Sequence, residues 1–170
     1  MKKDILKNLV YIALYSALFI VFDYISNSIS LFKMPQGGRL NLGSVVLILE
    51  SYHLGLKRGM LGSLVTILIM VIIGSADLSY GIISFLLDYV VGYLAYSISC
   101  IFKNYKYFFS GILFTTLIRL TASTISGVVV FETNFLASLL YQLTYLIPTM
   151  ILDLVLVPIL YNKLKPLFKK

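Results

Sequence analysis

Phe32–Gly59, FKMPQGGRLNLGSVVLILESYHLGLKRG, is the stretch around which the rest of the chain is organised. Its first part, Phe32–Asn41, contains glycine, proline and polar residues, which is typical of a loop. The apolar residues that follow, Leu42–Leu56, predict a short helix, which we expect to end at a basic turn, Lys57–Gly59. Both flanks are long and apolar, so we expect this loop to face the outer side of a membrane and to act as a lid or binding loop.

The composition indicates an integral membrane protein. Of the 170 residues 59% are hydrophobic and 12% charged, and the mean hydropathy is +0.95. A soluble domain of this length exposes too much of its surface to hide so many apolar residues. The net charge of +7 does not indicate nucleic-acid binding, because the lysines and arginines stand in short runs between apolar stretches, as topology signals do.

The apolar stretches predict an all-α integral membrane protein, in which residues 1–170 form one membrane domain with six transmembrane helices. A spanning helix needs about 20 apolar residues. The expected spans are residues 5–26, 42–56, 59–73, 79–102, 107–130 and 135–164. Spans two and three are short, and a tight, partly re-entrant hairpin is an alternative for them.

The basic residues predict the orientation. With six spans, nearly all of them fall on one side, and the opposite loops hold only Lys33 and Arg39, against Asp77 and Glu132. The positive-inside rule then places both termini in the cytoplasm of a multi-pass cell-membrane protein.

Polar residues on three consecutive spans reach a similar depth in the outer half of the membrane. Asp88 lies in span four and Arg119 and Ser123 in span five. Span six adds Tyr141, Gln142 and Tyr145. Ionisable groups in a bilayer are costly, and polar groups that converge at one level indicate a solute pocket open to the outside. The simpler alternative is a structural ion pair between Asp88 and Arg119.

Three further ionisable residues lie toward the inner ends of their spans. Glu50 and His53 are three residues apart, on one helix face, and we interpret them as a solvated ion cluster at the inner interface, with a proton relay as the alternative. Asp153 is interpreted as structural or partner-facing. The sequence contains no motif typical of an enzyme, a metal site or a cofactor site, so we expect none of these.

Ala13 and Ala17 in span one form a small-xxx-small pair, which lets another helix approach closely. Packing inside the bundle is the simpler explanation of such a pair.

Several motifs, in order along nearly the whole chain, resemble the thiamine-specific S components of energy-coupling factor (ECF) transporters. They are Met34-Pro35-Gln36-Gly37-Gly38, Gly55-Leu56-Lys57-Arg58-Gly59, Leu86-Leu87-Asp88-Tyr89, Leu117-Ile118-Arg119, Ile125-Ser126-Gly127 with Phe131, and Ser138-Leu139 with Tyr141 and Tyr145-Leu146-Ile147-Pro148.

The resemblance implies a six-helix substrate-binding subunit that captures a vitamin from outside and does not hydrolyse ATP. Such subunits join a transmembrane coupling protein and, through it, two cytoplasmic ATPases. Ala13 and Ala17 match the AxxxA pattern of the docking helix, which implies that they face the coupling protein. No cofactor and no nucleic acid is implied.

The resemblance also implies which residues contact the ligand, with departures from the family pattern. Asp88 followed by Tyr89 matches the acidic residue and tyrosine of span four, and an anionic group suits a cationic thiazolium. Ser123 stands where the family has histidine, Ala137 where it has tyrosine, and Gln142 where it has asparagine. The chain has no tryptophan to stack on the ligand. The substrate-binding set that we predict is Gln36, Asn41, Tyr80, Ser84, Asp88, Tyr89, Ser123, Phe131, Tyr141, Gln142 and Tyr145.

Three functions follow as hypotheses. The first is an S component that binds thiamine, or a related vitamin or precursor, under the Gln36–Asn41 loop. The second is a self-sufficient proton-coupled transporter or channel that uses Glu50, His53 and Asp88. The third is a structural membrane subunit without a ligand.

Overall fold

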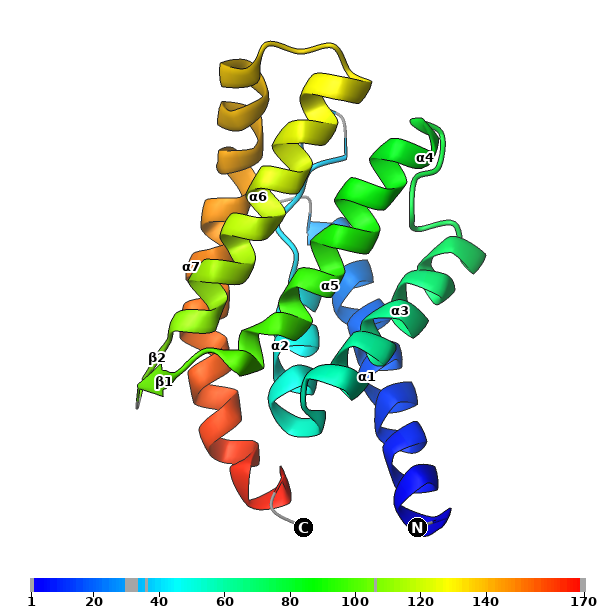
Figure 1. The fold of residues 1–170 in the computed structure, drawn as a ribbon, viewed down its shortest axis with the longest axis vertical. Helices are drawn as coiled ribbons and strands as arrows, with labels where there is room; N and C mark the ends of the chain where they lie inside the picture. The colour runs from blue at the N-terminus through cyan, green and yellow to red at the C-terminus, as the bar shows by residue number, and fades with distance from the viewer. Residues whose placement is uncertain (1, 30–33, 36, 106, 169–170) are drawn as a thin grey trace.

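The computed structural model describes residues 2–29, 34–35, 37–105 and 107–168, and nearly all of them are helical (Figure 1). In chain order the elements are α1 (Lys2–Ile29), α2 (Gly43–Leu54), α3 (Leu56–Ile72), α4 (Gly81–Ser84), the π-helix η1 (Phe85–Val91), α5 (Gly92–Ser97), the 3₁₀-helix η2 (Ile98–Ile101), β1 (Asn104–Tyr105), β2 (Phe108–Phe109), α6 (Ser110–Val130) and α7 (Phe135–Phe168).

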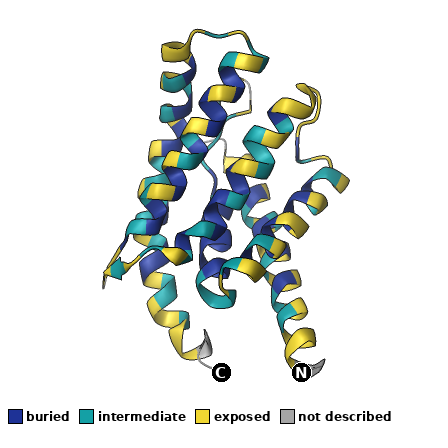
Figure 2. Cartoon of the chain, in the orientation of Figure 1, coloured by how far each residue is buried: buried dark blue, intermediate teal, exposed yellow. Residues whose placement is uncertain are grey.

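Among the described residues, four stretches are long and apolar enough to cross a membrane. They are Asp4–Ile29, Gly81–Ile101, Ser110–Val130 and Phe135–Pro166. These stretches carry exposed Leu, Ile, Val and Phe residues, and exposed positions recur along the long helices in Figure 2, which suits contact with lipid. The chain is therefore a helical membrane protein, as its composition predicts.

Helix α2 lies at the centre of the bundle, surrounded by other helices, and not on its lipid-facing surface. Its first nine residues, Gly43–Ser51, are buried, and it packs against α1, α3, α5 and α7. Its 12 residues rise only about 18 Å at 1.5 Å each, which is short of the roughly 30 Å of a bilayer core. The sequence of α2 is apolar because protein surrounds it. Hydropathy cannot distinguish a helix buried in protein from a helix that faces lipid.

The turn between α2 and α3 lies earlier than expected. Gly55, with φ of 79°, is the single residue between the two helices, and its N–H donates to the Ser51 carbonyl. A positive φ favours glycine, so the chain reverses there. The basic turn expected at Lys57–Gly59 is wrong, because these residues form the start of α3.

Residues 81–101 form one continuous helical stretch that changes its winding three times. The α-helical α4 passes into η1, then into α5, and the stretch ends in η2. A short hairpin, in which Asn104 pairs with Phe109 and Tyr105 with Phe108, then leads into α6. Helices α6 and α7 pack side by side (Figure 1). The start of α1 and the end of α7 lie at one end of the bundle, and the α6–α7 connection lies at the other (Figure 1).

Candidate functional site

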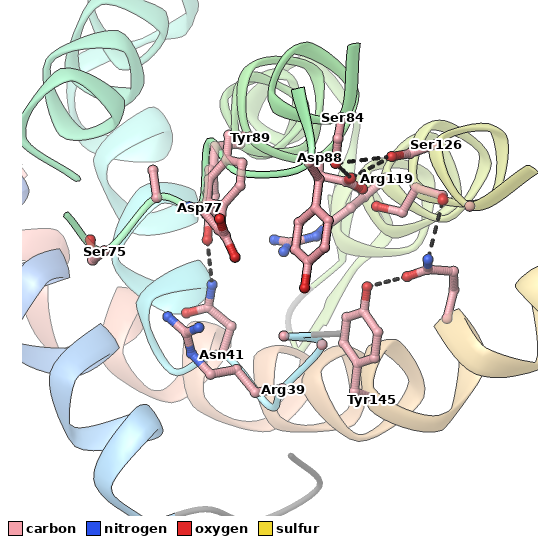
Figure 3. Close-up of a pocket in the computed structure, with 18 of the residues that line it drawn as sticks. Arg39, Asn41, Ser75, Asp77, Ser84, Asp88, Tyr89, Arg119, Ser126 and Tyr145 are labelled. Atoms are coloured by element: carbon pink, nitrogen blue, oxygen red, sulfur yellow. Dashed lines mark hydrogen bonds between the residues drawn. The ribbon is translucent and has the colours of Figure 1, made fainter. Parts of the chain in front are cut away.

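A cavity of about 800 Å³ lies among α1, the composite helix 81–101, α6, α7 and the segments that flank the α2–α3 pair (Figure 3). The predicted ligand residues that line it are Asn41, Tyr80, Ser84, Asp88, Tyr89, Ser123, Phe131, Tyr141, Gln142 and Tyr145. Gln36, the remaining candidate, lies outside the described residues. Ala137 and Gly38 also line the cavity. The tertiary structure thus brings together residues from six separate parts of the chain.

Asp88 is a carboxylate that two hydroxyl groups hold in place (Figure 3). Its Oδ2 accepts hydrogen bonds from Ser126 Oγ at 2.6 Å and from Ser84 Oγ at 2.9 Å. Within the described part of the chain, Oδ1 has no such partner. One oxygen therefore fixes the side chain, and the other stays available to a ligand in the cavity.

The π-helix η1 contains Asp88 and the adjacent Tyr89. A π-helical turn holds more residues than an α-helical turn, and such segments occur frequently at functional sites. Both consecutive side chains line the cavity. The Tyr89 hydroxyl also accepts a 2.9 Å hydrogen bond from the N–H of Asp77, which ties the α3–α4 loop to η1.

The ion pair expected between Asp88 and Arg119 does not form between these two described residues. Arg119 donates from Nη1 to the Tyr96 hydroxyl at 3.0 Å, and its guanidinium lies over the rings of Tyr93 and Tyr96, at 4.9 and 5.3 Å from the centroids. Asp88 takes its hydrogen bonds from serines instead. The guanidinium has aromatic faces and a hydroxyl to contact, so it needs no direct contact with Asp88.

A second polar group on the cavity wall joins α6 to α7. Gln142 Nε2 donates to the Ser123 carbonyl at 3.1 Å, and the Tyr145 hydroxyl donates to Gln142 Oε1. These contacts hold the Gln142 amide in one orientation. Ser123 contributes its backbone carbonyl to this contact.

The loop before α2 rests on α7. The N–H of Gly38 donates to the Tyr141 hydroxyl at 3.4 Å. A Cβ on Gly38 would lie 2.8 Å from Cδ1 of Tyr145, so only glycine permits this approach. The loop therefore lines the cavity and makes a close contact with α7.

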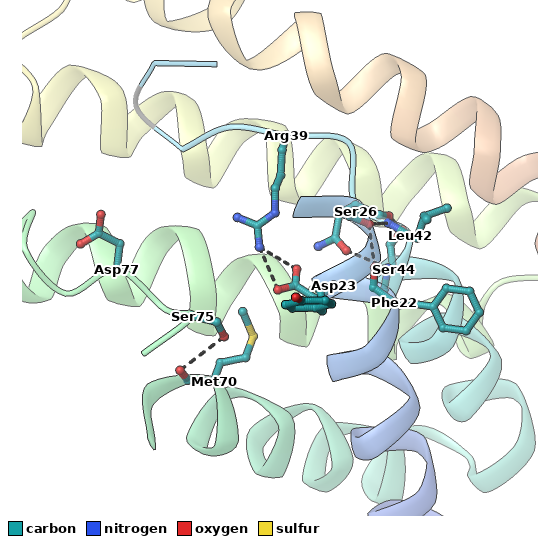
Figure 4. Close-up of polar contacts among 12 residues, drawn as sticks. Phe22, Asp23, Ser26, Arg39, Leu42, Ser44, Met70, Ser75 and Asp77 are labelled. Carbon is teal, nitrogen blue, oxygen red and sulfur yellow. Dashed lines mark hydrogen bonds and ion pairs between the residues drawn. The ribbon is translucent and has the colours of Figure 1, made fainter. Parts of the chain in front are cut away.

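An ion pair on the cavity wall was not predicted from the sequence. Nη2 of Arg39 contacts both carboxylate oxygens of Asp23, at 2.7 and 2.8 Å (Figure 4). The Asp23 side chain is only 6% exposed. Asp23 is an ionisable residue inside the apolar first span. Asp88 was selected because an ionisable group inside a membrane span is costly, and the same rule applied to Asp23 would have identified it.

We expect Arg39→Gln to lower the free energy of unfolding by about 1–2 kcal/mol, because it leaves the buried Asp23 carboxylate without its cation. Thermal unfolding in detergent measures this. The double variant Asp23→Asn with Arg39→Gln should recover most of the loss, since no unpaired charge stays buried. Equal stability of Arg39→Gln and the unmodified chain would contradict the expectation.

Asn41 serves the fold as well as the cavity. Its Oδ1 accepts from the N–H of Gly43 at the start of α2, and its Nδ2 donates to the Tyr93 hydroxyl at 3.2 Å. The side chain thus caps α2 and supports the cavity wall at once.

Aromatic rings and a third carboxylate lie at the loop end of the cavity. The rings of Tyr80 and Phe131, expected to act as platforms, contact each other with centroids 4.8 Å apart. Asp77 stands in the α3–α4 loop, where hydrogen bonds from the side chain and N–H of Ser79 hold the pKa of its carboxyl below its usual range. Asp77 is therefore ionised at neutral pH.

Of the ionisable residues assigned to the inner interface, Glu50 lies differently from the expectation, because it is 0% exposed and therefore not solvated. Asp153, interpreted as structural or partner-facing, is also 0% exposed, which agrees with the structural alternative and not with the partner-facing one. A hydrogen bond of 3.0 Å joins Nδ1 of His53 to the Tyr15 hydroxyl. The interpretation as a solvated ion cluster is wrong, because α2, which carries Glu50, lies inside the bundle.

Ala13 and Ala17 are exposed on α1. The simpler explanation, that they pack inside the bundle, therefore does not hold. The side chains of α1 that face inward include Ser16 and Phe19, both fully buried.

Comparisons with known proteins add an independent finding. The family model described as "Thiamine transporter protein (Thia_YuaJ)" matches residues 9–169. The chain is similar to a curated protein named thiamine transporter ThiT from Bacillus subtilis (strain 168), with 28% identity over 185 aligned positions that cover 96% of this chain and 95% of the relative. No solved structure matches the chain significantly.

Proposed function

The chain belongs to the thiamine transporter protein family, Thia_YuaJ, and from this premise we propose that it is the substrate-binding S component of an ECF-type transporter, which captures thiamine from the extracellular side. Membership of the family makes the protein a membrane protein of thiamine uptake and not an enzyme. The direction of capture, the ligand contacts and the partners are our proposal.

The observation that carries the proposal is the available Oδ1 of Asp88 in a cavity of about 800 Å³. Thiamine joins an aminopyrimidine, which needs hydrogen-bonding partners and flat neighbours, to a cationic thiazolium, which needs a negative charge. Asp88 supplies the charge, and Tyr80, Tyr89 and Phe131 supply rings. Gln142, Tyr141 and Tyr145 supply hydrogen-bonding groups, with Ser84 and Ser123 beside them.

We propose that the loop containing Gln36 and Asn41 closes over the bound ligand. The contact of Gly38 with Tyr141 and the ion pair of Arg39 with Asp23 support this, because both anchor the loop at the cavity. The pocket departs from the family pattern at Ser123, Ala137 and Gln142, so a related vitamin or precursor is the alternative substrate.

For the membrane arrangement we propose six segments and cytoplasmic termini in the cell membrane. The α2–α3 pair then forms two short segments beside the four long ones. The distribution of basic residues supports this orientation. So does the position of the α1 start and the α7 end at the same end of the bundle (Figure 1). The cavity then opens outward.

The proposed partners are a transmembrane coupling protein and, through it, two ATPase subunits that hydrolyse ATP. The exposure of Ala13 and Ala17 on α1 supports docking there, because small side chains let a second helix approach closely. No cofactor is part of the proposal.

The experiment that tests the function uses the purified chain in two forms. In detergent, thiamine should raise the thermal unfolding temperature, because a ligand of the folded state stabilises it by RT ln(1 + [L]/Kd). In liposomes that hold this chain alone, a pH gradient should drive no thiamine uptake. Uptake under these conditions would instead support the proton-coupled alternative, for which the buried carboxylate of Glu50 is the candidate proton carrier. The absence of any thermal shift in a folded sample would overturn the proposal.

A further inference from the structure

The residues of α6 that line the cavity follow one another in depth. Arg119, Ser123 and Ser126 all line it, and their spacing of four and three residues places them on one face of the helix. Ser126, which holds Asp88, lies toward the α6–α7 connection. Arg119 lies seven residues earlier on α6, which is about 10 Å deeper. Because it is the first residue of α6 that reaches the cavity, Arg119 belongs to the cavity floor.

The contacts between Arg119 and the composite helix agree with this depth. The Arg119 guanidinium lies 4.9 Å from the ring centroid of Tyr93, which is the last residue of the composite helix to line the cavity. A Cβ on Gly92 would lie 3.7 Å from Cγ of Arg119 and 3.9 Å from its Nε. Gly92 stands four residues beyond Asp88. Arg119 therefore crosses the composite helix about one turn deeper than Asp88.

Arg119 has hydrogen-bond donors that the fold does not use. A guanidinium carries five N–H donors. In the described part of the chain, Nη1 donates to the Tyr96 hydroxyl, Nε is buried without a partner, and Nη2 makes no hydrogen bond. The other contacts are the uncharged rings of Tyr93 and Tyr96. Arg119 is only 8% exposed, so an acceptor on a ligand in the cavity would reduce the cost of these unused donors.

The cavity therefore has charges of opposite sign at different depths. Asp77, Asp88 and Arg119 all line it (Figure 3). The two carboxylates lie toward the loop end, and the guanidinium lies at the floor. Thiamine has a matching polarity, because one methylene group joins its cationic thiazolium to a neutral aminopyrimidine whose ring nitrogens accept hydrogen bonds. The opposite orientation would place the thiazolium against the like charge of Arg119.

We propose that Arg119 is a specificity-determining residue of the cavity floor, which donates a hydrogen bond to a ring nitrogen of the neutral half of the ligand and so orients the cationic half toward Asp88. This inference rests on the proposed function and deepens it, because it gives the aminopyrimidine a place and a charged donor in the same cavity.

The probes are thiamine and a carbon analogue, in which C–H groups replace both ring nitrogens of the aminopyrimidine and the amino group and thiazolium stay unchanged. Titration calorimetry on the purified full chain gives both affinities for the unmodified protein and for Arg119→Met, whose unbranched apolar side chain has no donor. Both probes carry the thiazolium, so the change in long-range charge affects them equally and cancels in the ratio of affinities.

We expect the unmodified chain to prefer thiamine to the carbon analogue, and Arg119→Met to lower this preference about tenfold, because a hydrogen bond from a charged donor is lost. A purely structural role of Arg119 would weaken both ligands alike and leave the ratio unchanged. An unchanged ratio in a folded Arg119→Met variant would therefore overturn the inference.

Two matched variants complete the test. Arg58→Met makes the same substitution at an exposed residue of α3 that is absent from the cavity lining, and it should change neither affinity. Asp88→Asn should weaken both probes and keep their ratio, because Asp88 meets the thiazolium that both carry. A ratio that falls in Asp88→Asn and not in Arg119→Met would show the reverse orientation and overturn the inference.

If Arg119→Met does not fold, Arg119→Gln replaces it. Glutamine keeps a polar group for the Tyr96 hydroxyl, but its side chain is shorter and uncharged, so the preference for thiamine should still fall. An unchanged preference in this folded variant would overturn the inference, and so would equal affinities of the unmodified chain for the two probes. Failure of the unmodified chain to bind thiamine at all is a different result, which would overturn the proposed function itself.

Discussion

Asp88→Asn is expected to weaken thiamine binding by about thirtyfold or more. The asparagine keeps an oxygen that can accept from Ser126 and Ser84, so the side chain stays in place. What it loses is the negative charge in a cavity where the proposed ligand is a cation. Loss of a desolvated charge contact costs about 2–5 kcal/mol, and each 1.4 kcal/mol is a tenfold change in Kd. Titration calorimetry on the detergent-solubilised variant measures the effect.

A matched control for Asp88→Asn is Glu132→Gln. Glu132 is an exposed carboxylate in the α6–α7 connection and is absent from the cavity lining. The control should bind thiamine as the unmodified chain does, because surface charges in solvent are screened. If Asp88→Asn is folded and binds thiamine with unchanged affinity, the charge role of Asp88 is refuted.

Gly111→Ala is expected to destabilise the folded chain by about 2–3 kcal/mol, because it places a methyl group where α6 touches η2. A Cβ on Gly111 would overlap the carbonyl oxygen of Ser99 and would lie 2.8 Å from its Cα. These are backbone atoms, so no side chain can rotate away, and the two helices must separate. The midpoint of thermal unfolding in detergent should fall by several degrees.

Gly92→Ala provides the comparison for Gly111→Ala. Gly92 is also buried at the start of a helix, but a Cβ there would meet its nearest neighbour, the Leu87 carbonyl oxygen, at 3.6 Å. That is an ordinary contact, and alanine is a better helix former than glycine. Gly92→Ala should therefore be neutral or slightly stabilising. Equal effects of the two substitutions would contradict the argument from close packing.

The pattern of apolar residues predicts the helices of this protein closely. The expected spans 79–102 and 135–164 correspond to Gly81–Ile101 and Phe135–Phe168. The turn at Gly55 and the location of α2 at the bundle centre were not predicted. A helix surrounded by other helices has the same apolar sequence as one surrounded by lipid, so hydropathy alone cannot separate these cases.

The residues that line the candidate site were predicted from the sequence, but the contacts among them were not. Asp88, Ser123 and Gln142 do line one cavity. The direct pairing of Asp88 with Arg119 was wrong, because the π-helical winding of η1 and the serines around Asp88 determine which way that side chain points. Depth along a span follows from residue count, but rotation about the helix axis depends on the neighbouring helices.

By itself the sequence determines that this chain is a helical membrane protein, where its long helices run, and which family it resembles. These properties depend on the hydropathy and order of residues along the chain, which are local. The tertiary structure alone decides that Arg39 pairs with Asp23, that Arg119 lies against Tyr93 and Tyr96, and that Asp153 lies buried beside Ser44. Each of these contacts joins residues distant in sequence, and only the packing of helices against one another brings such charges and hydroxyl groups within reach.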